Sequence, residues 1–207
     1  MSAHNSSPME MIERLVGFPT VSSDSNLNLI EFVRDYLAGH GIESRLTYDD
    51  DKRKANLFAT IGPDRAGGVV LSGHTDVVPV AGQPWESDPF ALSRPGDKLY
   101  GRGTSDMKSF IAIALATVPT FLKAGLRRPI HLALSYDEEL GCFGVPRMLR
   151  DIAANLPLPA MAIIGEPTSM QLANRHKGDL VFRTVFTGRD GHSSAPHRGL
   201  NAILSAA

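Results

Sequence analysis

Several short apolar runs in this chain end in histidine or acidic residues. The runs and the residues that follow them are 68–72 with His74 and Asp76, 130–136 with Glu138 and Glu139, and 160–165 with Glu166. Apolar runs of this length, bounded by turn residues, are typical of buried strands. Because ligands bind outside the carboxyl ends of the strands in open α/β sheets, we expect these polar side chains to gather at one edge of a sheet.

Strand-like and helix-like segments alternate along most of the chain. Strands are expected at 42–48, 56–62, 68–74, 130–136 and 160–165, and helices from residue 8 and over 26–38, 108–123 and 144–155. This alternation predicts an α/β fold with a mainly parallel sheet flanked by helices. Residues 180–188 then alternate like a half-exposed strand, and a helix begins near 201. We therefore expect one domain over 1–176 and the beginning of a second over 177–207.

The composition excludes several other kinds of protein. The net charge is −1 and no basic run is present, so nucleic acid is not an expected partner. The longest apolar stretch, 110–119, is far shorter than the roughly 20 residues that span a bilayer. The N-terminus lacks the charged region and the apolar region of a signal peptide. Cys142 is the only cysteine, so an internal disulfide is not possible. The sequence thus predicts a cytoplasmic protein without a membrane partner.

The residues at the strand ends predict a metal site. Imidazole and carboxylate ligands together suit zinc, with cobalt or manganese as alternatives, and such a set can hold two cations about 3.5–4 Å apart. His74 would be one ligand, and Asp106, which precedes an apolar helical segment, could bridge the two ions. Glu138 and Glu139 are adjacent on a strand and point apart, so one can bind metal while the other accepts a proton. Each residue alone is more commonly a cap or a solvated group, whereas the five positions together favour metal.

A long loop, 81–97, is rich in Gly, Pro and Asp and carries the only tryptophan, Trp85. A loop of this length without secondary structure is uncommon unless it is functional. One wall of the site is then expected to consist of Trp85, Asp88 and Phe90. The alternative is that the two aromatic residues, Trp85 and Phe90, only anchor the loop to the core.

Five segments resemble, in the same order, the motifs of the M20 family of zinc aminoacylases and peptidases. They are residues 73–79, 99–108, 137–142, 165–168 and 191–203. Within the family, residues 82–90 and 137–142 are most similar to the acetylornithine deacetylase branch, with succinyl-diaminopimelate desuccinylases next.

The resemblance implies a zinc hydrolase that releases acetate from N-acetyl-L-ornithine in arginine biosynthesis, with a small N-acyl amino acid as substrate. It implies that residues 1–176 form an incomplete catalytic domain and that 177–207 begin an α+β dimerisation domain. The resemblance implies that one zinc binds to His74, Asp106 and Glu166, and that a second zinc binds to Asp106 and Glu139. It implies that Asp76 orients His74 and that Glu138 transfers the proton. It also implies that His192 of one subunit of a homodimer stabilises the oxyanion in the site of the other subunit.

One expected ligand lies beyond the sequence. The family completes its second metal site with a histidine from a later segment, and we expect this chain to be truncated before that segment. His131, His176 and His197 are conceivable substitutes, although His131 begins a strand whose other end precedes the acids. Two alternatives therefore stay open: another M20 peptidase activity, or an inactive remnant that acts only through association.

Overall fold

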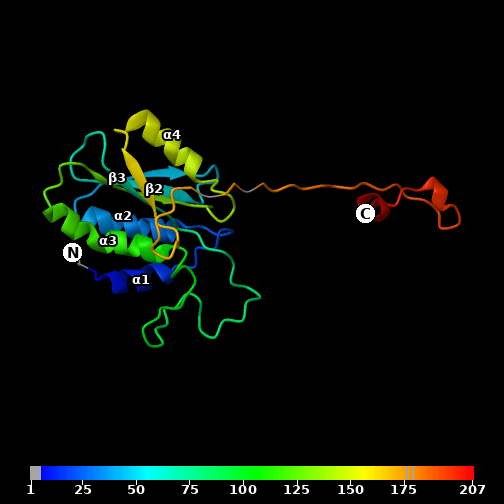
Figure 1. Cartoon of the computed structure of the whole chain (residues 1–207), viewed down its shortest axis with the longest axis horizontal. Coiled ribbons are helices and arrows are strands. Elements are labelled where there is room, and N and C mark those ends of the chain that lie inside the picture. The colour runs from blue at the N-terminus through cyan, green and yellow to red at the C-terminus, as the bar shows by residue number, and fades with distance from the viewer. Residues whose placement is uncertain (1–5, 176, 179) are drawn as a thin grey trace. The chain divides into compact units, whose positions relative to one another are not determined.

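The structure is a computed structural model that describes residues 6–175, 177, 178 and 180–207. The chain divides into two compact units, Met1–Met170 and Gln171–Ala207. The elements are α1 (Pro8–Val16), α2 (Leu27–Gly39), β1 (Ser44–Tyr48), β2 (Ala55–Ile61), β3 (Val69–His74), α3 (Lys108–Lys123), β4 (Ile130–Ser135), α4 (Val145–Asn155), β5 (Met161–Ile164), the 3-10 helix η1 (Pro196–Arg198) and α5 (Ala202–Ala206) (Figure 1).

The first unit is built on a five-stranded sheet of order β1-β2-β4-β3-β5. β3 pairs in parallel with both β4 and β5, whereas β2 pairs antiparallel with both β1 and β4. The α/β fold with flanking helices is confirmed, but the sheet is mixed rather than mainly parallel, because β2 runs opposite to both of its neighbours. The connection at 49–54 is too short for the crossover of a dozen or more residues that joins parallel neighbours, so β1 and β2 pair antiparallel. Helices α3 and α4 provide such crossovers for the three parallel strands.

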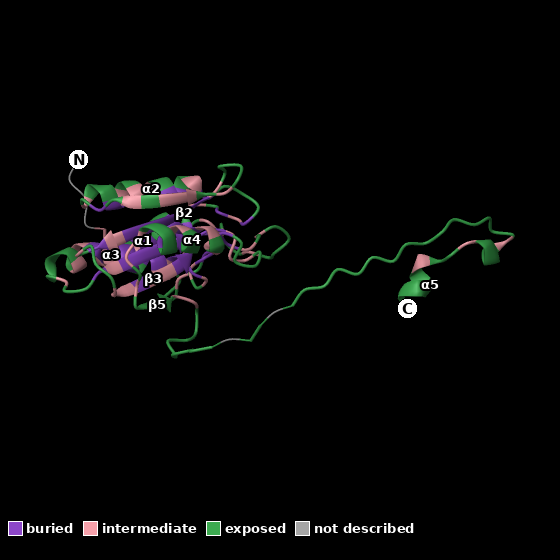
Figure 2. Cartoon of the chain, turned by 90° about the horizontal axis from the view of Figure 1, so that it is seen from above, coloured by how far each residue is buried: buried purple, intermediate pink, exposed green. Residues whose placement is uncertain are grey.

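Helices cover both faces of this sheet. α1, α2 and α3 lie on one side and α4 on the other (Figure 1). Side chains of a strand point alternately to the two faces, so in β2 Leu57 and Ala59 join the core under α1, α2 and α3, while Phe58 packs with Met148 and Ile152 of α4. Buried positions in Figure 2 accordingly follow the strands and the inward faces of the helices. The result is a sheet packed on both faces, whose strands can present polar groups at their carboxyl ends.

The second unit contains little regular structure. Residues 180–188 form no strand, so that expectation was wrong, whereas the helix expected near residue 201 is present as α5. A strand needs a neighbour that pairs with its backbone groups. In the described part of this unit, pairing is limited to a bridge between Arg189 and Leu200.

No helix among the residues that the structure describes combines the length and the apolar character needed to cross a membrane.

Candidate metal centre

The parallel strands bring the predicted polar residues to one edge of the sheet. β3 ends at His74, β4 ends three residues before Glu138, and β5 ends two residues before Glu166. Because these three strands run in the same direction, their carboxyl ends lie together. Asp106 reaches the same place from the residues that precede α3.

His74 lies at the middle of this cluster and is only 2% exposed. Its Nε2 atom is 2.9 Å from Asp106 Oδ1, 3.6 Å from Glu166 Oε1 and 3.8 Å from Glu138 Oε2. The other ring nitrogen, Nδ1, is 2.9 Å from the backbone carbonyl oxygen of Asp76. An N–H at Nδ1 that donates to this carbonyl leaves Nε2 free to bind a cation on the side of the acids.

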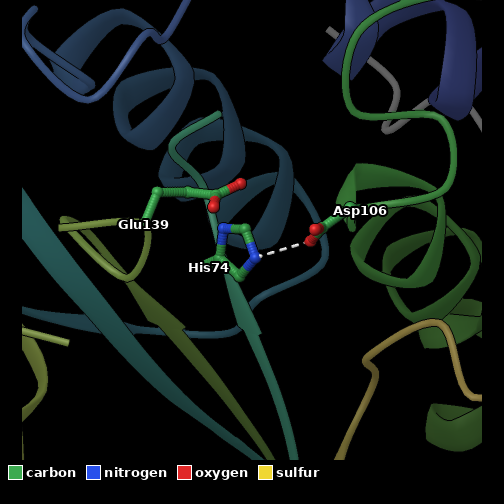
Figure 3. A group of neighbouring side chains, drawn as sticks. All are labelled: His74, Asp106 and Glu139. Carbon is green, nitrogen blue, oxygen red and sulfur yellow. Dashed lines mark hydrogen bonds and ion pairs between the residues drawn. The ribbon is translucent and has the colours of Figure 1, made fainter. Parts of the chain in front are cut away.

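Glu139 completes a group of three possible ligands. One ligand atom from each of His74, Asp106 and Glu139 lies within 4.8 Å of the others. Figure 3 shows the three side chains converging from the end of β3, from the residues just before α3 and from the turn after β4. The structure therefore brings His74, Asp106, Glu138, Glu139 and Glu166 together, and their individual roles stay predictions.

Asp76 has contacts that sequence reasoning did not anticipate. Its carboxylate is 3.6 Å from His74 Nδ1, farther than its own backbone carbonyl. The carboxylate instead accepts hydrogen bonds from Ser22 Oγ at 2.7 Å and from the backbone N–H groups of Glu138 at 3.1 Å and Glu139 at 3.3 Å. Asp76 thus holds the backbone of the two acids as well as the ring of His74. No local spacing signals this contact, because the partners are 54 to 63 residues away.

Burial and neighbouring charges shift the pKa values of several side chains in the cluster. Burial opposes a charge on His74, but the hydrogen bonds and charge of Asp76 outweigh burial and raise the pKa of His74 to about 9. Burial, followed by the neighbouring Asp106 carboxylate, raises the pKa of Glu139. Burial is also the main reason that the pKa of Glu166 is raised, and Asp106 and Glu138 add to it. The carboxylates repel one another, and a cation among them would relieve this repulsion.

The donor set fits divalent metal ions. One imidazole nitrogen and several carboxylate oxygens are the ligand types that zinc and cobalt accept. The orientation of the ring through its second nitrogen is also characteristic of histidines that bind metal. The residues present are therefore chemically suited to the metals that the sequence predicts.

Among the other candidate histidines that the structure describes, His131 belongs to the first unit and lies outside the cluster. His192 and His197 belong to the second unit, where His192 Nδ1 is 2.8 Å from Ser194 Oγ. His131 lies near the amino end of β4, stacked on Phe58 with its Nδ1 3.0 Å from Thr60 Oγ1. His176 lies outside the described residues.

The loop 81–97 has an internal structure of its own. The indole N–H of Trp85 donates to Gln83 Oε1 at 3.0 Å, and the Arg102 guanidinium lies 5.2 Å from the centre of the indole ring. Leu92 and Leu99 pack against the main core. The loop lines a hollow of about 660 Å³ whose lining residues are Gln83, Pro84, Trp85, Glu86, Ser87, Ser93, Pro95 and Tyr100. Trp85 is thus held by one polar side chain of the loop and by Arg102, which follows the loop in the sequence.

Comparison with known proteins identifies related sequences and folds. The sequence model of peptidase family M20/M25/M40 matches residues 70–181. The acetylornithine deacetylases of Yersinia pestis and of Pasteurella multocida (strain Pm70) are 39% and 36% identical, over 94% of this chain and 52% of each relative. The chain therefore spans about half the length of the curated relatives it matches.

Two solved structures show the same fold at low sequence identity. An M20 family metallo-carboxypeptidase from Sulfolobus solfataricus has a TM-score of 0.68 at 18% identity, covering 77% of this chain and 37% of the other. Human carnosine dipeptidase 1 has a TM-score of 0.60 at 20% identity, covering 77% and 38%.

Proposed function

The chain belongs to peptidase family M20/M25/M40, and on this basis we propose that it carries the metal-binding part of a hydrolase that converts N-acetyl-L-ornithine into L-ornithine and acetate. The observation that carries a metal-dependent reaction is the position of His74 Nε2 within 4 Å of the carboxylates of Asp106, Glu138 and Glu166. The choice of substrate is supported by 39% identity to an acetylornithine deacetylase.

The proposed ligands divide between two zinc ions, with cobalt as an alternative. His74, Asp106 and Glu166 would hold one ion, and Asp106 with Glu139 would hold the other. When bound, such ions polarise the acyl carbonyl and make water more acidic. The carbonyl of Asp76 keeps the His74 ring in the tautomer that offers Nε2 to this site.

Glu138 is the proposed general base. Its carboxylate is 3.8 Å from His74 Nε2, and this distance supports the assignment. The carboxylate would accept a proton from the attacking water as the C–O bond forms, and would then donate this proton to the amine as the C–N bond breaks. Ornithine leaves with the proton, and the acetyl group leaves as acetate.

We also propose a role for the second unit. Residues 177–207 would begin an α+β dimerisation domain, and His192 from the partner subunit of a homodimer would donate a hydrogen bond to the developing oxyanion. The enzyme would act in the cytoplasm, as expected for a pathway that makes an amino acid.

Hydrolysis of N-acetyl-L-ornithine by the 207-residue chain tests the proposal, with Zn²⁺ or Co²⁺ added. Turnover should be lost in Glu138→Ala by about 10²–10⁴-fold. The control variant is Glu13→Ala, because Glu13 is an exposed carboxylate on α1. Cleavage of N-succinyl-diaminopimelate or a dipeptide in place of N-acetylornithine would show that the proposed acetylornithine deacetylase activity is wrong and that the chain acts on another substrate of the family. Hydrolysis of none of these substrates would contradict the proposed activity and favour an inactive, associating chain.

A further inference from the structure

We propose that the ion pair between Lys54 and Asp137 is a positioning device for the turn that carries Glu138 and Glu139. Neither residue belongs to the predicted ligands or to the proton-transfer group. The inference rests on the proposed function, because it assigns both residues to the same metal centre. It adds a charged contact to this centre from Lys54, the residue just before β2.

The pair holds a backbone position that needs support. Asp137 has φ of 56°, in the left-handed region, and immediately precedes Glu138. This conformation costs an ordinary residue roughly 1–2 kcal/mol, and Asp and Asn are among the few that adopt it regularly. Lys54 Nζ is 2.6 Å from Asp137 Oδ1, and both side chains are only 14% exposed. The contact therefore fixes the residue at which the chain turns towards the metal centre.

Lys54 is itself fixed by two further contacts. Its Nζ atom also donates to the backbone carbonyl of Ser22 at 2.6 Å, and its backbone N–H donates to Asp49 Oδ1 at 2.9 Å. Ser22 in turn donates its hydroxyl to the Asp76 carboxylate at 2.7 Å. The ammonium group consequently has a defined position from which it can hold Asp137.

Two connections therefore run from Ser22 to the acidic turn. One passes through Lys54 to the side chain of Asp137, and the other passes through Asp76 to the backbone N–H groups of Glu138 and Glu139. Together they restrain three consecutive residues of the turn. Because charged hydrogen bonds between poorly solvated groups are stronger than neutral ones, loss of Lys54 should release the first of these restraints.

The test is Co²⁺ binding by the 207-residue chain, followed by the visible absorption of the bound ion. Lys54→Met keeps the length of the side chain but removes its charge, and it should weaken Co²⁺ binding by tenfold or more, within the range for groups that orient metal ligands. The absorption spectrum should also change, because the proposed ligand Glu139 is displaced. Lys54→Arg keeps the charge and should restore most of the affinity.

A matched control separates positioning from general loss of an ion pair. Arg45→Met breaks the pair between Arg45 of β1 and Asp151 of α4, and it should leave Co²⁺ affinity and spectrum unchanged. If Lys54 acts through Asp137, the double variant Lys54→Met/Asp137→Asn should bind Co²⁺ no more weakly than the weaker of the two single variants. Should Lys54→Met not fold, Asp137→Asn alone provides the test, because Asn tolerates the left-handed backbone.

The outcomes distinguish the two proposals. A wild-type chain that binds no Co²⁺ would overturn the proposed metal-dependent function. A wild-type chain that binds Co²⁺, together with a folded Lys54→Met variant of equal affinity and spectrum, would overturn the positioning role alone. Equal weakening by Lys54→Met and Arg45→Met would also overturn it, because the effect would then be one of stability.

Discussion

Replacing Asp76 by Asn tests whether the Asp76 carboxylate organises the site. The carboxylate is buried, and its two oxygens accept from different backbone N–H groups: Oδ1 from Glu138 and Oδ2 from Glu139. An Asn side chain has one carbonyl oxygen and one NH₂ group. Whichever way the amide is placed, one of the two backbone N–H groups faces another donor. Ser22 can adapt, because its hydroxyl can also accept a hydrogen bond.

The size of the effect follows from these contacts. The two N–H groups are part-buried, so leaving one of them without an acceptor costs towards the lower end of about 1–3 kcal/mol, and the hydrogen bonds that remain change from charged to neutral, which are weaker by about 1 kcal/mol. Asp76→Asn should therefore lower the free energy of unfolding at pH 7 by about 2–4 kcal/mol. Since Glu138 and Glu139 lose a backbone restraint, Co²⁺ affinity should fall by about 10–100-fold in the same variant.

The pH dependence provides a second check. Burial alone would raise the pKa of Asp76, but the nearby His74 ring and hydrogen bonds from Ser22 and the Glu138 N–H outweigh burial and lower this pKa below its ordinary value of 3.8. A carboxyl group whose pKa is lower in the folded state stabilises the fold above its unfolded pKa, and this stability is lost as the pH falls through the folded pKa. The difference between wild type and Asp76→Asn should thus be complete at pH 7 and should shrink below about pH 4.

Urea unfolding followed by far-ultraviolet circular dichroism, with a chelator present, measures this difference without a metal contribution. Asp24→Asn is the control, because Asp24 is an exposed carboxylate close to Ser22 in the sequence. The reasoning is refuted if Asp76→Asn unfolds within about 0.5 kcal/mol of wild type at pH 7, which is the usual range for a surface substitution.

Two further predictions concern acid stability and metal binding. Burial lowers the pKa of His131 from its ordinary value of 6.5, so the unfolded chain binds protons at a higher pH than the folded chain, and stability should fall as the pH drops below about 6.5. His131→Phe should therefore flatten the dependence of the melting temperature on pH between 5 and 7. An unchanged slope in this variant would contradict the assignment. Co²⁺ at a concentration of 100 times its Kd should stabilise the wild-type chain by about 2.7 kcal/mol. This stabilisation should raise the melting temperature, and a chelator should reverse the rise. A chain that melts at the same temperature with and without Co²⁺ would argue against a metal centre.

Local sequence patterns were sufficient to predict most of the elements. α3 begins and ends at the predicted residues, 108 and 123, and the strands of the first unit lie within about two residues of their predicted bounds. The reason is that helical and strand periodicities, together with Gly and Pro at the ends of the segments, are written in neighbouring residues. The expected strand at 180–188 shows the limit of this reasoning, because alternation supplies no pairing partner.

The sequence by itself therefore determined which residues end the strands, and with them the polar groups that can meet at His74. Only the tertiary structure decided the mixed direction of the sheet and the partners of Asp76 and Lys54. The physical reason is distance along the chain. Strand ends follow from local periodicity, whereas the hydrogen bonds that hold the acidic turn join residues 62 to 83 positions apart, and such contacts exist only once the sheet has brought those residues together.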